Sequence, residues 1–189
     1  IKAFVKSTDN VITIRPEMSF KEVLDNYGYP VTTKTQATTI RKLTTQNLSE
    51  RFRNKLLNGD ERGNVGMLAK RWKPLLVAPF KVSEQCCDVM KKRPFKKFYK
   101  ETKLAMFTGE MANDNTSRQI EYLKSGCNAF DNNIPKSKPL GFWLEEDIWN
   151  YIRTYSVPYS KIYDMGVART GCMFCMFGAH LEKEPNRFQ

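Results

Sequence analysis

The stretch Lys103-Leu104-Ala105-Met106-Phe107-Thr108, which ends before Gly109, is the clearest candidate for a core strand. A short apolar run closed by a glycine is typical of a strand inside a sheet. On its C-terminal side we expect a helix over 115–124, a short strand over 139–143 and a helix over 144–152. Strands that alternate with helices indicate a parallel sheet that is covered on both faces.

A further strand and a capped helix are predicted near the N-terminus. The β-branched run over 11–14 is followed by Pro16 and is typical of a short strand. Ser19 and Glu22 have the spacing of a capping box, so we expect a helix over 20–27. This part therefore continues the alternation of strands and helices.

Helical spacing of apolar residues predicts another helix within 45–58. Ser49 has no glutamate or glutamine three residues later, so it does not complete a capping box. We therefore expect this helix to begin nearer Thr45 or Asn47.

Four of the five cysteines form two pairs, the tandem Cys86-Cys87 and the C-x-x-C of Cys172 and Cys175. We expect the tandem pair on a helix over 83–91, with a separate helix beginning a few residues later, at the proline of the basic stretch. Four converging thiolates can hold an iron–sulfur cluster or a zinc ion. In a reducing compartment, paired cysteines indicate metal or redox chemistry rather than structural disulfides.

The tandem pair favours a cluster over a single ion. Neighbouring residues on a helix point about 100° apart, which suits thiolates that bind different irons better than two ligands of one tetrahedral ion. A zinc site would combine one tandem cysteine with Cys172, Cys175 and His180, the only histidine. We therefore expect a [4Fe-4S] cluster, with zinc as the alternative. The isolated Cys127 is expected to be an inert thiol.

The positive charge of this chain is concentrated in its first half. The net charge is +11, and residues 1–100 carry 21 lysines and arginines against nine acidic residues. The densest stretch, residues 91–100, indicates either a phosphate or nucleic-acid surface or a solvated helix face. No apolar run approaches the roughly 18 residues of a membrane span. We therefore expect a cytoplasmic protein with no membrane partner.

Three segments are similar, in order, to the phosphoadenosine phosphosulfate reductase family. The second has the family pattern P-x-x-x-W-x-x-x-D-I-W, and the third has P-x-x-x-x-Y-x-x-G. The segments are residues 107–110 with Arg118, residues 139–149 and residues 158–166. The resemblance covers about residues 80–180.

This resemblance implies an α/β fold with a Rossmann-like parallel sheet and helices on both faces, of the adenine nucleotide alpha hydrolase-like kind. We expect one partial α/β domain over 1–189, with a basic N-terminal part over 1–80 and a family-like core over 81–180. The family's Ser-Gly-Gly-Lys-Asp-Ser phosphate loop is not found in the sequence. We therefore expect a fragment that lacks the N-terminal strands and is itself inactive.

The cysteines narrow the resemblance to the adenosine phosphosulfate reductases, which hold a [4Fe-4S] cluster with a CC and a later C-x-x-C. The matching positions here are Cys86, Cys87, Cys172 and Cys175. The resemblance also implies an adenine nucleotide or sulfonucleotide as substrate and a thiol reductant protein as partner. The implied nucleotide-binding or anion-binding residues are Gly109, Arg118 and Arg169.

Two departures from the family leave the reaction open. No cysteine follows Cys175, although reductases use one near the C-terminus as nucleophile, so no catalytic residue is assigned. Glu110 and Met111 stand where relatives commonly carry an arginine or an apolar residue. Alternatives to a reductase are a sulfur-transfer enzyme for nucleic acid, of the phosphorothioation or thiolation type, and a non-catalytic nucleotide- or nucleic-acid-binding protein with a structural metal site.

Overall fold

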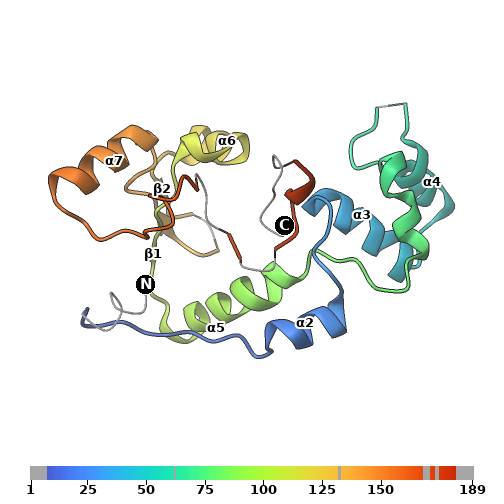
Figure 1. Ribbon diagram of the computed structural model, residues 1–189, viewed down its shortest axis with the longest axis horizontal. Helices are drawn as coiled ribbons and strands as arrows, with labels where there is room; N and C mark the ends of the chain where they lie inside the picture. The colour runs from blue at the N-terminus through green and yellow to red at the C-terminus, as the bar shows by residue number, and fades with distance from the viewer. Residues whose placement is uncertain (1–7, 62, 132, 168–170, 173–174, 182–189) are drawn as a thin grey trace. The chain divides into compact units, whose positions relative to one another are not determined.

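The computed structural model describes residues 8–61, 63–131, 133–167, 171–172 and 175–181. Contacts divide them into two compact units. The first, here called the cysteine unit, comprises residues 14–95 and 171–181, and the second, the sheet unit, comprises residues 8–13 and 96–167 (Figure 1). The predicted division at residue 80 stays a prediction.

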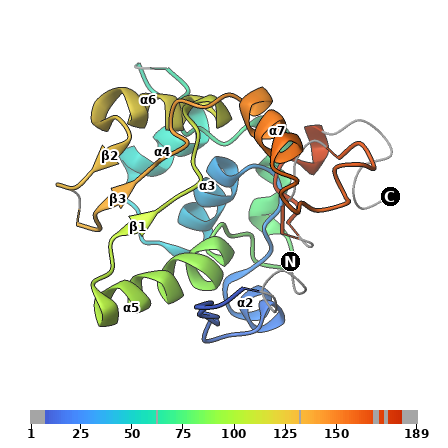
Figure 2. The same ribbon diagram turned by 90° about the vertical axis from the view of Figure 1, so that its left-hand side faces the viewer.

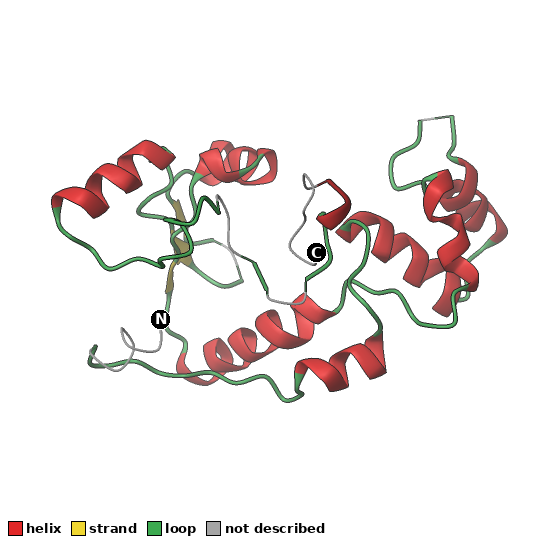
Figure 3. Cartoon of the chain, viewed as in Figure 1, coloured by secondary structure: helices red, strands yellow, loops and turns green. Residues whose placement is uncertain are grey.

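The cysteine unit begins with a series of helices (Figure 3). They are α2 (Phe20–Tyr27), α3 (Lys34–Thr45), α4 (Glu50–Asn58) and the 3-10 helix η1 (Lys70–Val77). The predicted capping box of α2 is confirmed, because the N–H of Glu22 donates to Oγ of Ser19 at 3.3 Å and the N–H of Ser19 donates to Oε2 of Glu22 at 2.7 Å. Gly28 ends the helix, as its position after Tyr27 suggests.

The start of α4 corrects our prediction. The helix begins at Glu50 with Ser49 as its N-cap, and not near Thr45 or Asn47. Oγ of Ser49 accepts the N–H of Phe52 at 3.4 Å. One such bond already satisfies an unpaired donor of the first turn, so the reciprocal glutamate of a capping box is not required. Helix α3, which we did not predict, occupies the residues before Gln46.

Two buried clusters form the core of this unit. The first is built from α3, α4 and the segments that follow them: Ala37, Ile40, Leu43, Leu56, Leu68 and Val82. The second joins α2 to the helix that carries the tandem cysteines: Val23, Cys86 and Val89. Phe177 packs against both clusters.

A close backbone approach at Gly28 joins the end of α2 to the segment before the cysteines. Gly28 has φ of +106°, and a Cβ atom there would lie 2.6 Å from the carbonyl oxygen of Lys81. The N–H of Tyr29 donates to that same oxygen at 2.8 Å, and the N–H of Ser83 donates to the Tyr29 carbonyl at 3.1 Å. Only glycine combines this φ with so close a neighbour.

An ion pair makes a second connection to the same segment. The guanidinium of Arg41, on α3, donates from Nε and Nη2 to the carboxylate of Glu84, with a shortest distance of 2.7 Å. Burial is the largest single influence and raises the pKa of Glu84, but the hydrogen bonds and charge of Arg41, together with hydrogen bonds from the Glu84 backbone and Thr38, lower it below its usual value. The ion pair thus links α3 to Glu84, which lies two residues before Cys86.

The tandem cysteines open one continuous helix, and the predicted break at Pro94 was wrong. From Cys86 the chain runs through a π-helical turn, η2 (Asp88–Lys92), directly into α5 (Arg93–Thr102). The N–H of Arg93 donates to the carbonyl of Asp88, five residues earlier. Pro94 directly follows this π-helical turn, whose wider i to i−5 bonding accommodates a residue without an N–H inside the helix.

The sheet unit contains three short strands that lie side by side (Figure 2). They are β1 (Met106–Phe107), β2 (Asn128–Ala129) and β3 (Lys136–Ser137), in the order β1-β3-β2. β1 pairs with β3 in parallel and β2 pairs with β3 antiparallel. Helices combined with a sheet that contains a parallel pair confirm the predicted α/β class, and β1 lies within the predicted strand 103–108.

Two other strand predictions were wrong. Residues 11–14 form no strand, and the side chains of Val11 and Ile12 are 45% and 67% exposed. A β-branched run becomes a strand only where a neighbouring strand pairs with it. Residues 139–143 form no strand; residues 139–142 form turns, in which the N–H of Gly141 donates to the Lys138 carbonyl at 2.9 Å. The strand of this region lies just before them, at β3.

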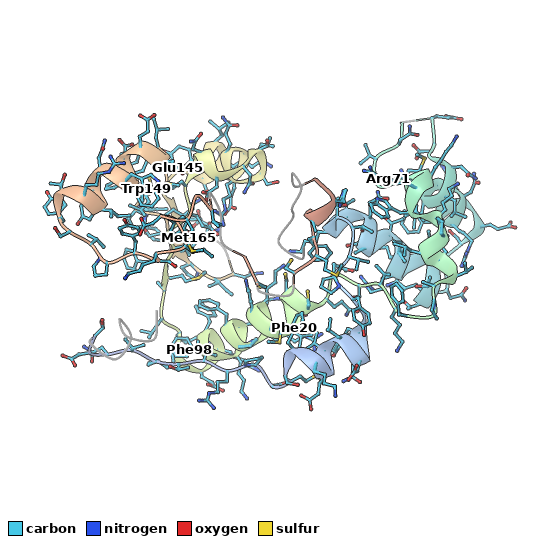
Figure 4. The ribbon with its side chains drawn as sticks, in the orientation of Figure 1. Phe20, Arg71, Phe98, Glu145, Trp149 and Met165 are labelled. Atoms are coloured by element: carbon cyan, nitrogen blue, oxygen red, sulfur yellow. The ribbon has the colours of Figure 1, made fainter. Side chains whose placement is uncertain are left out.

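Both helices predicted for the sheet unit are confirmed, as α6 (Thr116–Ser125) and α7 (Glu145–Thr154). The amide oxygen of Asn115 caps α6 by accepting the N–H of Arg118 at 3.1 Å. Trp149 of α7 makes edge-on ring contacts with Tyr159 and Tyr163 of the following loop (Figure 4). Two short 3-10 helices complete the structure, η3 (Ala112–Asp114) in the sheet unit and η4 (Ala179–Leu181) in the cysteine unit. No helix among the described residues is long and apolar enough to cross a membrane.

The approach at Gly28 can be tested by adding a methyl group. We expect Gly28→Ala to lower the free energy of unfolding by roughly 2 kcal/mol or more, since it adds a steric clash to an unfavourable φ. Gly63→Ala is the matched control, because Gly63 has φ of +102° but no atom within 4 Å of the added Cβ. It should cost about 1 kcal/mol. Urea unfolding measures both; equal losses would contradict the close approach.

The ion pair predicts a pH-dependent loss of stability. We expect Glu84→Gln to lower the free energy of unfolding at pH 7 by about 1–3 kcal/mol, because Arg41 then lacks its carboxylate. The folded-state pKa of Glu84 is lowered. Its contribution is therefore present above the unfolded pKa of roughly 4.3 and is lost as the pH falls through the lower folded value.

The difference between wild type and Glu84→Gln should accordingly shrink below about pH 4. Asp60→Asn is the control, because the pair of Asp60 with Lys55 is more exposed. Its loss should stay below about 1 kcal/mol. Urea unfolding at several pH values measures these differences, and a pH-independent difference for Glu84→Gln would contradict the assignment.

Candidate metal centre

The two cysteine pairs, far apart in sequence, lie in the same compact unit. Cys86 and Cys87 are the first residues of the helix that leads into α5. Cys172 and Cys175 come from the C-terminal segment, where the N–H of Cys175 donates to the Cys172 carbonyl at 3.0 Å. Cys86 is buried, Cys87 and Cys175 are half-buried, and Cys172 is exposed.

All four cysteines line one cavity of about 240 Å³. The lining residues are Phe20, Pro30, Cys86, Cys87, Met90, Lys91, Cys172 and Cys175. Phe20 extends from α2 beside the start of the cysteine helix (Figure 4). The volume is far above the roughly 10–15 Å³ that a single water needs, so the cavity has room for a group of several atoms.

Burial and neighbouring sulfur raise the pKa of the Cys86 thiol to about 12. Burial is the larger cause, and the nearby Cys87 and Cys175 add to it. Cys86 is therefore a neutral thiol at neutral pH. A metal that binds here must displace its proton, because the thiolate is the ligand.

Lys91 supplies a positive charge among these sulfurs. It lies in the π-helical turn, four residues after Cys87, and lines the cavity. A hydrogen bond to Cys172 raises the pKa of the Lys91 ammonium group, and the charges of Cys172, Cys87 and Cys175 raise it further. We did not predict this role. The spacing of four residues from Cys87 on a helix was the signal that could have revealed it.

In the part of the chain that the structure describes, the four cysteines share one cavity without forming a closed site for a single ion. Among the described residues, no three His, Cys, Asp or Glu side chains form a group close enough to hold one metal ion. His180, considered above as a zinc ligand, is not among the residues that line the cavity. Its ring packs edge-on against Trp72, with ring centroids 5.2 Å apart.

The two described residues predicted to bind anions, Gly109 and Arg118, do not form a free cationic site. Arg118 pairs with Asp114, and its Nη2 lies 3.9 Å from the Glu110 carboxylate. The acidic residue at position 110 thus offsets part of the charge that a phosphate would need. Gly109 lies exposed in the loop after β1, also in the sheet unit, and Arg169 lies outside the described residues.

A second charged cluster in the sheet unit was not predicted. Lys136 of β3 contacts both Glu110 and Glu121, and the pKa of Glu121 is lowered chiefly by its hydrogen bond from Lys136. Lys138 is almost fully buried and donates from Nζ to Oγ of Ser125 at 3.2 Å. Nothing in the local sequence distinguishes Lys138 from a surface lysine. The charged groups of this cluster therefore pair with one another inside the sheet unit.

Cys127 belongs to the sheet unit and not to the cavity. A hydrogen bond with Cys127 raises the pKa of the Tyr122 hydroxyl, and the Cys127 carbonyl accepts the N–H of Lys138 at 2.7 Å. These contacts give Cys127 a place in the packing of this unit.

A protein-family model matches most of this chain, and individual known proteins match about half of it. The family model described as phosphoadenosine phosphosulfate reductase domain matches residues 6–177. Adenosine 5'-phosphosulfate reductase 2 of Bacillus subtilis is 31% identical over 91 residues, which are 48% of this chain and 37% of that protein. Adenosine 5'-phosphosulfate reductase of Allochromatium vinosum is 30% identical over 92 residues, 49% of this chain and 35% of that protein.

An uncharacterized protein of Methanocaldococcus jannaschii is 30% identical over 100 residues, which are 48% of this chain and 19% of that protein. The alignments therefore span little more than a third of the length of these relatives, or less. The family match is much broader on this chain and includes both cysteine pairs. This chain belongs to the phosphoadenosine phosphosulfate reductase domain family.

Proposed function

We propose that this chain is part of an oxidoreductase that acts on an adenine sulfonucleotide and holds a [4Fe-4S] cluster on Cys86, Cys87, Cys172 and Cys175. One observation carries the proposal: all four thiols line a single cavity. The two relatives named adenosine 5'-phosphosulfate reductase support the reaction class. The cavity supports the cofactor independently of them.

The donor set fits a cluster better than zinc. Four cysteines are the usual ligands of a [4Fe-4S] cluster. A zinc ion would need every sulfur within about 2.3 Å of one point, whereas these sulfurs border a cavity of about 240 Å³. His180 is engaged by Trp72, which removes the most plausible nitrogen ligand from a zinc site.

The residues around the cavity have separate tasks in this proposal. When bound, a [4Fe-4S] cluster supplies an iron centre whose potential depends on its hydrogen bonds and exposure. Phe20, Pro30 and Met90 form an apolar wall that excludes water. The Lys91 ammonium group offsets the negative charge of the thiolates, and Cys86 gives up its proton on ligation.

The sulfonucleotide would need cations beyond Arg118, because Glu110 and Asp114 already pair with that side chain. Arg169 is proposed for this role, since it precedes the C-x-x-C by three residues. Release of sulfite from a sulfonucleotide requires two electrons, and we propose a thiol reductant protein as their source.

The cluster predicts a defined metal content. Anaerobically purified protein should contain about four irons and about four sulfides per chain. Cys86→Ser and Cys175→Ser should each lose most of both, because a ligand is removed. Cys127→Ser is the matched control and should keep them, since Cys127 lies in the other unit. Stoichiometric zinc without sulfide would refute the proposal.

A second candidate function is contact with a nucleic acid, as a sulfur-transfer enzyme would require. Helix α5 carries a basic face, defined here as Arg93, Lys96, Lys97 and Lys100, and all four residues are exposed. At about 100° per residue they fall within one third of the helix circumference. The aromatic residues Phe95, Phe98 and Tyr99 occupy the opposite side and are half-buried. A row of exposed cations is suited to backbone phosphates.

This candidate predicts salt-dependent binding that depends on α5. The affinity for a single-stranded DNA of about 20 nucleotides should fall as salt rises, and Lys96→Gln with Lys100→Gln should reduce the log–log slope by about 1.4. The control, Lys124→Gln with Lys161→Gln, removes the same charge from other exposed positions and should leave the slope unchanged. Equal slopes for the two variants, measured by fluorescence anisotropy, would exclude α5 as the contact.

A further inference from the structure

We propose that Phe177, with the contacts of Gly178 and His180, anchors the C-terminal segment and so positions the second cysteine pair at the cavity. We call residues 176–180 the anchor segment. The inference rests on the proposed function for its consequence, a complete metal site. The anchoring itself can be measured without metal.

The two cysteine pairs are held in very different ways. Cys86 is part of a buried cluster with Val23 and Val89, on a helix that continues into α5. Cys172 and Cys175 lie before the short η4 and are joined to each other by one backbone hydrogen bond. In the described part of this segment, a single backbone hydrogen bond reaches the rest of the unit, from the N–H of Gly178 to the Thr32 carbonyl at 2.9 Å.

Phe177 supplies the apolar part of the attachment. It follows Cys175 by two residues and packs against both buried clusters, the one of α3 and α4 and the one that contains Cys86. No other residue of the anchor segment belongs to either cluster, among those described. Phe177 is half-buried. Full burial of a phenylalanine is worth about 1.5–3 kcal/mol and one hydrogen bond about 0.5–1.5 kcal/mol, so Phe177 contributes to the attachment at least as much as the Gly178 bond.

Two residues of the helical part of the unit contact Gly178 and His180, which follow Phe177. Thr32, whose carbonyl accepts from Gly178, is buried and has φ of +69°. This conformation is unfavourable for a β-branched residue and is retained only where surrounding contacts require it. Trp72 of η1 receives the His180 ring. The anchor segment thus lies beside the start of α3 (Figure 1).

The consequence concerns the composition of the cavity wall. Six of its eight lining residues come from positions 20–91, and the other two are Cys172 and Cys175. Release of the anchor segment would remove two of the four thiols without changing any ligand. Phe177 is therefore a positioning residue for the metal site.

The first test measures hydrogen exchange on the metal-free chain of residues 1–189. Phe177→Ala should raise the exchange rate of the Gly178 N–H by about 10- to 100-fold. At fixed pH it should also raise the alkylation rate of Cys175 relative to Cys86, read by peptide mass spectrometry. Met176→Ala is the matched control, because Met176 is adjacent but 40% exposed and outside both clusters; it should behave as wild type.

A second variant separates release of the segment from loss of the fold. His180→Ala removes only an exposed ring contact and should raise Gly178 exchange by about 2- to 10-fold, while the N–H of Ala37 in α3, bonded to Thr33, keeps its protection. The proposed anchoring role of Phe177 would be overturned if Phe177→Ala and Met176→Ala had the same Gly178 exchange rate and the same Cys175 alkylation rate.

Iron analysis distinguishes this inference from the proposed function. If the anchor and the cluster are both correct, Phe177→Ala should lose most of its iron and sulfide while Met176→Ala retains them. Wild-type protein without iron, together with fast exchange in Phe177→Ala, would leave the anchor intact and refute the cluster. Full iron content and full protection of the Gly178 N–H in Phe177→Ala would support the cluster and refute the anchor.

Discussion

The close approach of Gly28 and Tyr29 to Lys81 and Ser83 is the constraint on which the cysteine unit depends. It joins the end of α2 to the segment that delivers the tandem cysteines. Val23 of α2 can then bury Cys86 and Val89 in one cluster, and Pro30 can form part of the cavity wall. Backbone hydrogen bonds between distant segments require a defined separation, and here only a residue without a Cβ permits it.

Charge is used differently in the two units. In the cysteine unit, Lys91 lies among sulfurs that would be anionic in a metal site, so its charge compensates a ligand shell. In the sheet unit, Glu110, Glu121 and Asp114 pair with neighbouring arginine and lysine side chains. The excess positive charge of the chain is therefore left on exposed faces such as that of α5.

Local chemistry explains which predictions succeeded. Ser19 with Glu22 and Asn115 with Gly126 are caps whose hydrogen bonds span only a few residues, so the helices between them follow from neighbouring side chains. The strand at 11–14 failed for the opposite reason. Its apolar residues resemble those of a strand, but pairing depends on a distant segment. The predicted break at Pro94 failed because the π-helical turn just before it allows the helix to continue. No sequence pattern predicted that turn.

The four cysteines as candidate ligands, the α/β class and the family could be predicted from the sequence, because motif spacing and residue chemistry are properties of the chain order. The folded structure was needed to learn that both pairs line one cavity, that Lys91 lies among their sulfurs, and that His180 packs on Trp72. It also showed that Glu110 and Asp114 occupy Arg118. These outcomes depend on contacts between residues that packing brings together, and spacing along the chain does not specify them.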